Sequence, residues 1–331
     1  MKEKTYLMES NFLSPYAFKS IDTVGRLRKE ESCPMRTEFQ RDRDRILHSK
    51  AFRRLKNKTQ VFFSPEGDLY RTRLTHTLNV SQIARAIART LSLNEDLTEA
   101  MALGHDLGHT PFGHSGERIL SRLNPNGFNH NEQSGRVVDV LERDGQGLNL
   151  TREVVDGIVN HKMSKDPKTL EGKAVRIADK IAYINHDIDD ALDSGFITVD
   201  DLPKAEIEFL GKTSSKRINT MIKSICAESD GKNKVEMEKD VFAATMNLRK
   251  FLFASVYSDS LFAKEEEKAD RMITALYEYY GKNVDKMPEP NVKMIDEYGL
   301  DTVLCDYISS MSDVFVVKKF TELFIPNKWK I

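Results

Sequence analysis

The chain has 331 residues, enough for one large helical domain or for a catalytic core with an appendage. Its 50 basic and 51 acidic side chains nearly cancel, so net charge does not indicate binding to nucleic acid or to an anionic membrane. No stretch approaches the ~20 apolar residues of a membrane span, and the first residues lack an export signal. Three scattered cysteines exclude a disulfide framework. We therefore expect a cytoplasmic protein.

Glycine and proline are scarce, at 17 and 10 residues, and apolar residues recur at helical spacing. This pattern predicts an all-α fold. We expect an irregular N-terminal arm over residues 1–35, a catalytic core over 36–200, and a C-terminal helical region over 201–331 that packs on the core. All eight histidines lie between His48 and His186, inside the predicted core, which is where we expect the chemistry.

Two basic stretches come first in the predicted core. In FQRDRDR at 39–45, arginine and aspartate alternate, which favours a salt-bridge lattice within the segment. In KAFRRLKNKTQ at 50–60, Arg53, Arg54, Lys56 and Lys58 either line an anion site or serve solubility. These alternatives stay open.

The next segment, residues 71–91, predicts a helix. Apolar residues at Leu74, Leu78, Ile83, Ile87 and Leu91 recur at helical spacing, and Arg73 and His76 stand three residues apart on a common side. A cation would then lie beside a candidate metal ligand, although a polar surface histidine would give the same pattern.

The segment HDLGHTPFGHSGE at 105–117 is less ordinary, because it places His105, Asp106, His109, His114 and Glu117 within thirteen residues. The glycines on either side of the His-Asp pair allow a backbone, ion or ligand to approach closely. A proline and a glycine should end the helix after His109. A new helix near His114 would then bring Glu117 beside it, an arrangement typical of a proton-transfer pair.

Three further histidines follow. His130 could be a supporting base or an N-terminal turn residue of the next helix, and His161 and His186 are expected to be structural hydrogen-bonding residues.

The segment 172–195 predicts one long helix. Its apolar stripe contains Ile177, Ile181, Ile184, Ile188 and Leu192, and another face carries Asp179, Tyr183, Asp187 and Asp190. Such an acidic line is either solvated or compensated by a cation or a substrate. Imidazoles and carboxylates together suit a borderline divalent ion such as Mn, Fe, Co, Ni or Zn, which can polarise a phosphoryl oxygen.

These motifs resemble those of the HD-domain phosphohydrolases, named for an adjacent His-Asp pair, and within them the deoxyguanosinetriphosphate triphosphohydrolases and their bacterial relatives. The resemblance runs from LSPYAFKS at 13–20 to ADKIAYINHDIDDAL at 178–192, and HDLGHTPFGHSGE with DKIAYINHD carries most of its specificity. It implies an all-α fold, with an HD-domain helical core and additional C-terminal helices. It also implies that the protein hydrolyses deoxynucleoside triphosphates (dNTPs) to a deoxynucleoside and tripolyphosphate.

The resemblance also implies roles for individual residues. The metal ligands would be His76, His105, Asp106 and Asp179, with manganese favoured over Mg, Fe, Co, Ni or Zn. Arg73 and Tyr183 would meet the phosphates, and Gln60 with Asp187 the 3′-hydroxyl. The catalytic cluster would be His109, His114 and Glu117, with His130 as an accessory. A homo-oligomer is expected, and a dNTP could also act as activator.

One segment departs from the family. Val314 and Phe315 stand where relatives usually have Arg-Tyr, which puts a nucleotide contact from that segment in doubt. Two alternatives remain: another HD phosphohydrolase, such as a 5′-deoxynucleotidase, and a non-catalytic regulator that binds nucleotide and metal.

Overall fold

The structure is a computed structural model and describes residues 2–60, 71–257 and 260–326. Within these residues helices form the fold, and bridges of sheet type are limited to two isolated pairs, Arg26 with Thr151 and Thr59 with Thr72. The all-α prediction is therefore confirmed. No helix in this part of the chain combines the length and apolarity needed to cross a membrane.

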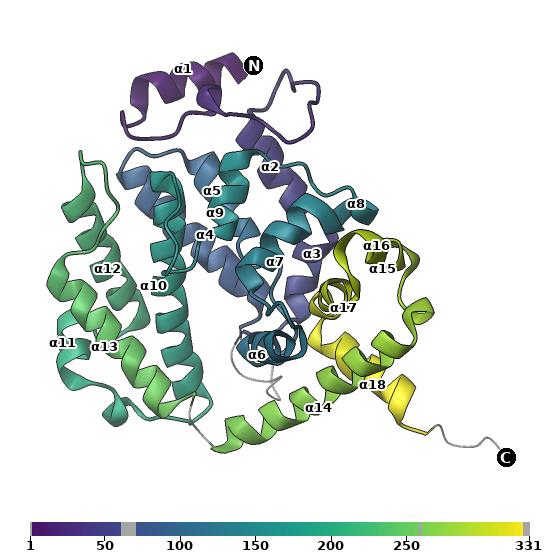
Figure 1. Ribbon diagram of the computed structural model, residues 1–331. Helices are drawn as coiled ribbons and strands as arrows, with labels where there is room; N and C mark the ends of the chain where they lie inside the picture. The colour runs from purple at the N-terminus through teal and green to yellow at the C-terminus, as the bar shows by residue number, and fades with distance from the viewer. Residues whose placement is uncertain (1, 61–70, 258–259, 327–331) are drawn as a thin grey trace.

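The larger of two apolar clusters surrounds the long helix α10 (Figure 1). Its side chains come from helices before and after α10 in the chain. These helices are α2 (Glu38–Leu47), α3 (Lys50–Arg54), α4 (Arg73–Thr90), α5 (Glu95–Gly104), α9 (Arg152–Val159), α10 (Leu170–Asp193), α11 (Lys204–Leu210), α12 (Ser214–Ser229) and α13 (Lys239–Ser255). Because α11 to α13 contribute to this cluster, apolar packing is continuous across the domain boundary predicted at residue 200.

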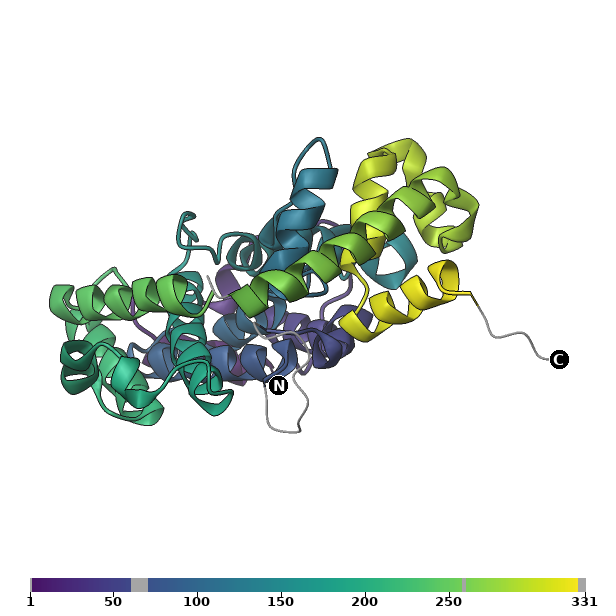
Figure 2. The same ribbon diagram turned by 90° about the horizontal axis from the view of Figure 1, so that it is seen from below.

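A second apolar cluster joins α6 to the C-terminal helices. In Figures 1 and 2, α14 runs from the side of α11 to α13, past α6, toward α15 to α18. The helices of this part are α6 (Gly113–Leu123), α14 (Ser260–Lys282), α15 (Glu289–Val292), α16 (Ile295–Tyr298), α17 (Leu300–Ser309) and α18 (Asp313–Phe324). The remaining elements are α1 (Lys2–Phe12), α7 (His130–Arg136), α8 (Glu142–Gly145), the π-helical η3 (Val137–Leu141), and the 3₁₀ turns η1 (Ser20–Asp22), η2 (Leu55–Asn57), η4 (Val199–Asp201) and η5 (Val284–Lys286).

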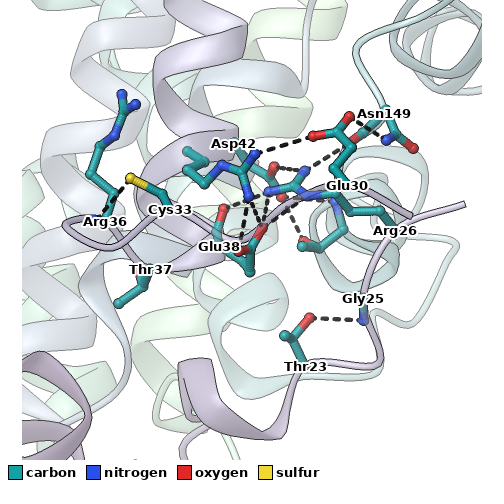
Figure 3. A network of polar contacts seen from close by, with 12 residues as sticks. Thr23, Gly25, Arg26, Glu30, Cys33, Arg36, Thr37, Glu38, Asp42 and Asn149 are labelled. Atoms are coloured by element: carbon teal, nitrogen blue, oxygen red, sulfur yellow. Dashed lines mark hydrogen bonds and ion pairs between the residues drawn. The ribbon is translucent and has the colours of Figure 1, made fainter. Parts of the chain in front are cut away.

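The N-terminal arm is more ordered than its sequence predicts. It contains the helix α1, and it is fastened to the core by the buried guanidinium of Arg26 (Figure 3). Arg26 Nε donates to Glu38 at 2.9 Å, and a terminal nitrogen pairs with Asp42, whose other oxygen accepts from the Thr151 backbone N–H at 2.8 Å. A charge buried with this many partners holds the arm in one position.

The alternating segment at 39–45 does not form the internal lattice that was predicted. Arg41 pairs with Glu38 and Glu30, and Arg45 also pairs with Glu30. Only Arg43, which contacts Asp44, has an ion pair within the segment among the residues described. Helical spacing places neighbouring charges on different faces, so Arg41 and Arg45 pair with acids outside residues 39–45, and Arg43 also pairs with Asp96 and Glu99.

Helix α4 begins at Arg73, and its N-cap residue Thr72 accepts from the backbone of Thr75 in a capping box. Ile83, Ile87 and Leu91 of the predicted stripe are buried, but Leu78 is 49% exposed. His76 and Val80 lie on the buried face with Ile83, at steps of four and three residues. His76 therefore points into the protein and is not a surface histidine.

The turn that carries the His-Asp pair begins earlier than predicted. Helix α5 ends at Gly104 and not after His109, and α6 begins at Gly113. A Cβ at Gly104 would lie 2.4 Å from Ile158 Cδ1, and one at Gly108 would lie 2.1 Å from the backbone nitrogen of Ser134. The glycines thus let α9 and α7 approach the turn as closely as the sequence suggested.

Helix α10 starts at Leu170, and its N-cap residue Thr169 accepts from the backbone N–H of Gly172 at 3.1 Å. Ile181, Ile184 and Ile188 are fully buried, as predicted. The acidic face is not a solvated one, since Asp187 is 1% exposed and Asp190 is paired with Arg71.

A candidate metal centre and an adjacent histidine cluster

The four predicted metal ligands lie together, between α4, the turn after α5, and α10. His76 Nε2 is 3.1 Å from Asp179 Oδ1, and His105 Nε2 is 3.8 Å from the same oxygen. His105 Nε2 is also 3.6 Å from Asp106 Oδ1. Nitrogen and oxygen donors therefore converge on one small volume, although they come from positions up to 103 residues apart.

The donor set fits a divalent transition metal, because one buried nitrogen, His105 Nε2, has no hydrogen-bond partner. His105 is completely buried, and its Nδ1 lies 2.6 Å from the Ala102 carbonyl oxygen. A carbonyl only accepts, so Nδ1 carries the proton and Nε2 presents a lone pair. This lone pair has no hydrogen-bond partner. Metal-bound histidines are commonly oriented in this way by a carbonyl behind the ring.

The two carboxylates of this group are held ionised. Burial alone would raise the pKa of Asp106, but His105 and Arg73 lower it well below the usual value. Arg73 donates to Asp106 Oδ2 at 2.8 Å. For Asp179, burial is likewise outweighed by the His76 hydrogen bond and the nearby imidazole of His105, which lower its pKa to about 2. Both side chains can therefore act as anionic ligands at neutral pH.

Next to this group, His109, His114, Glu117 and His130 place their ligand or proton-transfer atoms within 4.8 Å of one another. His114 Nδ1 lies 3.1 Å from Glu117 Oε2, and its side chain is 65% exposed. His130 Nδ1 lies 2.9 Å from the same carboxylate oxygen. The structure thus brings together all four residues of the predicted catalytic cluster, with only His114 open to solvent.

Glu117 orients this cluster. Although burial raises the pKa of Glu117, its hydrogen bonds with His114 and His130 hold it well below the usual value. Lys162 Nζ also donates to it at 3.1 Å. His109 stacks on His130 at 4.5 Å between ring centroids, and both of its nitrogens lack partners. Burial, with the charge of Arg73, lowers the pKa of His109 well below its usual value, so this ring is neutral.

Besides Arg73, two of the predicted substrate residues, both on α10, contact other side chains. Tyr183 OH accepts from Arg249 Nε at 2.8 Å, and burial raises the pKa of Tyr183 to about 12. Asp187 accepts a hydrogen bond from Tyr257, and burial nevertheless raises the pKa of Asp187 to about 7.

Gln60 and Asp187, predicted to hold a sugar hydroxyl together, make no hydrogen bond to each other. Each has a buried side-chain oxygen without a partner, Oε1 of Gln60 and Oδ1 of Asp187. The backbone carbonyl of Gln60 accepts from Arg73 at 3.3 Å. Arg73 therefore touches both the metal group, through Asp106, and the segment of Gln60.

Several contacts at the site were not predicted. Lys58 is one of the four basic residues for which the sequence left a site role and a solubility role undecided. It is buried and donates to the carbonyl oxygens of His109 and Ser309. Asp313, at the start of α18, accepts from the backbone N–H of Thr59 at 2.9 Å and of Phe112 at 3.0 Å. It thereby joins the segment before Gln60 to the start of α6. The neighbouring Val314 is 64% exposed.

His161 was expected to be structural, and its Nδ1 does lie 2.7 Å from the Ile158 carbonyl oxygen. Its Nε2, however, lies in the site, 3.2 Å from His130 Nε2. His186 is close to His76, with 5.9 Å between ring centroids, and its buried Nδ1 has no partner. A histidine alone in a polar loop offers no sequence signal that could have placed His161 here.

The chain is similar in sequence to known proteins and protein families. Residues 73–184 match the HD domain, and residues 235–322 match a phosphohydrolase-associated domain. A deoxyguanosinetriphosphate triphosphohydrolase-like protein from Caldanaerobacter subterraneus subsp. tengcongensis is 57% identical over 329 residues, which cover 99% of this chain and 97% of that protein. A protein of the same description from Clostridium tetani is 45% identical, with 99% of this chain and 97% of that protein covered.

A crystal structure of a phosphohydrolase from Bacteroides thetaiotaomicron has a similar fold. The TM-score is 0.54 at 16% sequence identity, over 85% of this chain and 69% of that one. At this identity the likeness concerns the fold alone.

Proposed function

Because the chain belongs to the family of deoxyguanosinetriphosphate triphosphohydrolase-like proteins and is an HD-domain hydrolase, we propose that it cleaves dNTPs to a deoxynucleoside and tripolyphosphate. The observation that carries this proposal is the position of His114, an exposed imidazole oriented by Glu117, beside a group of two histidines and two aspartates of which all but Asp179 are buried. Proton transfer and metal-assisted hydrolysis need these two groups next to each other.

The metal group would be His76, His105, Asp106 and Asp179. A divalent ion held there would supply a Lewis acid for phosphoryl oxygens, and we propose manganese, since two imidazoles with two carboxylates suit a borderline transition ion. Arg73 offers forked donors beside this group and is the proposed contact for the phosphate chain. Arg249, which donates to Tyr183, adds a second cation at that tyrosine.

The proton chemistry would belong to His114. The Glu117 carboxylate is an anion, so it accepts a hydrogen bond from the Nδ1–H of His114. Nε2 of His114 is therefore free to take or return a proton. Through Nε2, His114 would remove a proton from the attacking water or supply one to the departing 5′-oxygen. Lys162 and His130 hold Glu117 from the other side and keep its carboxylate in one orientation.

The sugar would be bound at Asp187 and Gln60. Each presents a buried oxygen acceptor without a partner, and leaving such an atom unsatisfied costs about 1–3 kcal/mol. A hydroxyl of the deoxyribose could satisfy Asp187, whose other oxygen is occupied by Tyr257. The predicted homo-oligomer, a dNTP activator and the cytoplasmic location stay predictions, as do the predicted domain boundaries.

The test is to incubate the manganese-loaded protein with each dNTP, each ribonucleoside triphosphate and each deoxynucleoside monophosphate, and to separate the products by ion-exchange chromatography. We expect tripolyphosphate and a deoxynucleoside from at least one dNTP. Pyrophosphate or orthophosphate as the main product would contradict the proposal, and hydrolysis of monophosphates alone would favour a 5′-deoxynucleotidase.

Two variants assign the roles. Asp106→Ala should abolish activity, because it removes a ligand and the partner of Arg73. His114→Gln should lower kcat by about 10²–10⁴-fold, the usual contribution of general acid–base catalysis. The exposed His48 lies outside both clusters, so His48→Gln is the control and should keep full activity. Binding of dNTPs with no turnover in the unmodified protein would instead indicate a regulator.

A further inference from the structure

One buried lysine at the site lacks a carboxylate partner among the described residues. Lys58 is 3% exposed, and its Nζ donates to two backbone carbonyl oxygens, that of His109 and, at 2.8 Å, that of Ser309. Burial and the charge of Arg54 lower the pKa of Lys58 to about 7. Burying such a group without an ion pair is unfavourable. An apolar side chain would fill the same space without this cost, so the two hydrogen bonds are what a lysine contributes here.

The two carbonyl groups belong to segments that lie far apart in the chain. His109 lies in the turn between α5 and α6, and Ser309 is the last residue of α17. The last carbonyl oxygens of a helix have no partner within the helix and carry the negative end of its dipole. An amine has two N–H groups even when it is neutral, so Lys58 can donate to both oxygens in either protonation state. Lys58 therefore fastens the His109 peptide group to the end of α17.

The turn after His109 has a backbone that needs support. Phe112 has a φ of +59° and Gly113 a φ of +58°, and this left-handed conformation is unfavourable for phenylalanine. Asp313 accepts from the Phe112 backbone N–H at 3.0 Å. His114 is the next residue after this turn, and its ring centroid lies 5.2 Å from that of His109. The direction of the His114 side chain therefore depends on how the peptide groups before it are held.

The backbone of Lys58 supports the other group of the site. Its carbonyl oxygen accepts from the backbone N–H of Arg73, the first residue of α4, at 3.0 Å. Arg73 in turn donates to Asp106, and His76 lies one turn further along the same helix. One residue thus contacts both the start of the helix that carries His76 and the turn that leads to His114.

We propose that Lys58 is a positioning residue, which sets the place of His114 relative to the metal group by holding the His109 peptide group against the end of α17. The inference rests on the proposed function in taking His114 as the proton-transfer residue. Lys58 would touch neither the phosphates nor the reacting water, because both of its hydrogen-bond partners are backbone atoms. A displacement of about 1 Å at a catalytic site can cost about 100-fold in rate, so the lysine should act on kcat and not on KM.

The first measurement compares Lys58→Met with Lys204→Met, which changes an exposed lysine at the start of α11. Methionine keeps most of the length of the side chain and removes its N–H donors. With the dNTP that the unmodified protein cleaves best, Lys58→Met should lower kcat by about 10–100-fold and change KM by less than about twofold. Lys204→Met should change neither. An unchanged kcat in a folded Lys58→Met variant, or a loss that lies mainly in KM, would overturn the proposal.

A double variant tests whether Lys58 acts through His114. Lys58→Met combined with His114→Gln should be no slower than His114→Gln alone, because the position of an imidazole that is absent no longer matters. If the two losses in kcat multiplied, Lys58 would act independently of His114 and the proposal would be wrong.

Nuclear magnetic resonance of isotope-labelled histidine rings gives a readout that does not depend on turnover. In Lys58→Met the ring signals of His109 and His114 should shift, and that of the exposed His48 should not. Unchanged signals would contradict the proposal even in a protein that cleaves dNTPs. If the signals shift but the unmodified protein releases no tripolyphosphate, the proposed function fails and the positioning of His114 by Lys58 stands.

A second variant covers the case in which Lys58→Met does not fold. Lys58→Arg keeps N–H donors but places them on a longer, planar group. It should shift the ring signals of His109 and His114 and lower kcat by a smaller factor. If neither the signals nor kcat changed in Lys58→Arg, the proposal would fail.

Discussion

Glu171, in the first turn of α10, is a buried carboxyl that makes no ion pair within the described residues. Its side chain has no exposed surface, and its Oε1 accepts from the backbone N–H groups of Phe18 and Asn94, each at 3.0 Å. Oε2 has no partner. Burial raises the pKa of Glu171 from 4.5 to about 7, even though these backbone hydrogen bonds oppose the shift. We predict that this one group makes the fold less stable as pH rises toward neutrality.

The sign follows from proton uptake. Between about pH 4.5 and pH 7 the folded chain keeps a proton on Glu171 that the unfolded chain has lost. The stabilisation is complete below the unfolded pKa and is lost as pH rises through the folded one. Each pH unit between the two pKa values changes the free energy of unfolding by about 1.4 kcal/mol. Over the whole interval, the carboxyl should cost about 3 kcal/mol of stability.

The assay compares the free energy of unfolding in urea for the unmodified chain and Glu171→Gln, at several values between about pH 5 and pH 8. Glutamine keeps the accepting oxygen and cannot ionise, so the variant should gain stability relative to the unmodified chain as pH rises, by about 3 kcal/mol in total. Glu208→Gln, at an exposed position, is the matched control and should show no such trend. A difference between the two chains that stayed constant with pH would refute the reasoning.

Three further predictions concern the site and its supports. Asp313→Ala removes a carboxylate that accepts hydrogen bonds from two backbone N–H groups. The variant should lower the free energy of unfolding by about 3 kcal/mol in urea unfolding, and should reduce kcat in steady-state kinetics. Gly108→Ala would place a Cβ 2.1 Å from a backbone nitrogen of α7, and should lower stability by about 1–3 kcal/mol in the same unfolding assay. Tyr257→Phe leaves Asp187 without its donor, and should raise the KM for a dNTP by about tenfold with a smaller change in kcat.

The first two of these predictions have matched controls. Asp200→Ala changes an exposed aspartate and should leave both stability and kcat unchanged. Gly281→Ala in α14 would meet only Leu304 at 3.6 Å, an ordinary contact, so it should be neutral or slightly stabilising. Equal losses in Gly108→Ala and Gly281→Ala would contradict the packing argument. If Tyr257→Phe left the KM unchanged, the proposed role of Asp187 in substrate binding would be wrong.

The local sequence pattern was enough to predict those features that depend only on residues close together in the sequence. Helical spacing predicted α4 and α10 to within two residues at each end, and the glycines beside His105 and Asp106 predicted a close backbone approach that the structure contains. The types of residue in the turn predicted a site with both metal-ligating and proton-transfer groups. Side-chain chemistry and short-range periodicity are properties of the sequence itself.

The tertiary structure decided which face of each helix is buried and what its polar atoms meet. Periodicity could not distinguish the face of Leu78 from the face of His76 on α4, because both carry apolar residues at helical steps. The π-helical turn η3, the early end of α5 and the helix in the N-terminal arm were likewise absent from the prediction by local pattern.

The contacts that complete the site join residues far apart in the chain: His130 with His161 across 31 residues, Tyr257 with Asp187 across 70, and Asp313 with Thr59 across 254. A side chain's reactivity is set by its own atoms, so the sequence determined which residues could bind a metal or move a proton. The partner of each lone pair is set by where other backbones pass, and only the packed helices bring those backbones within hydrogen-bond distance.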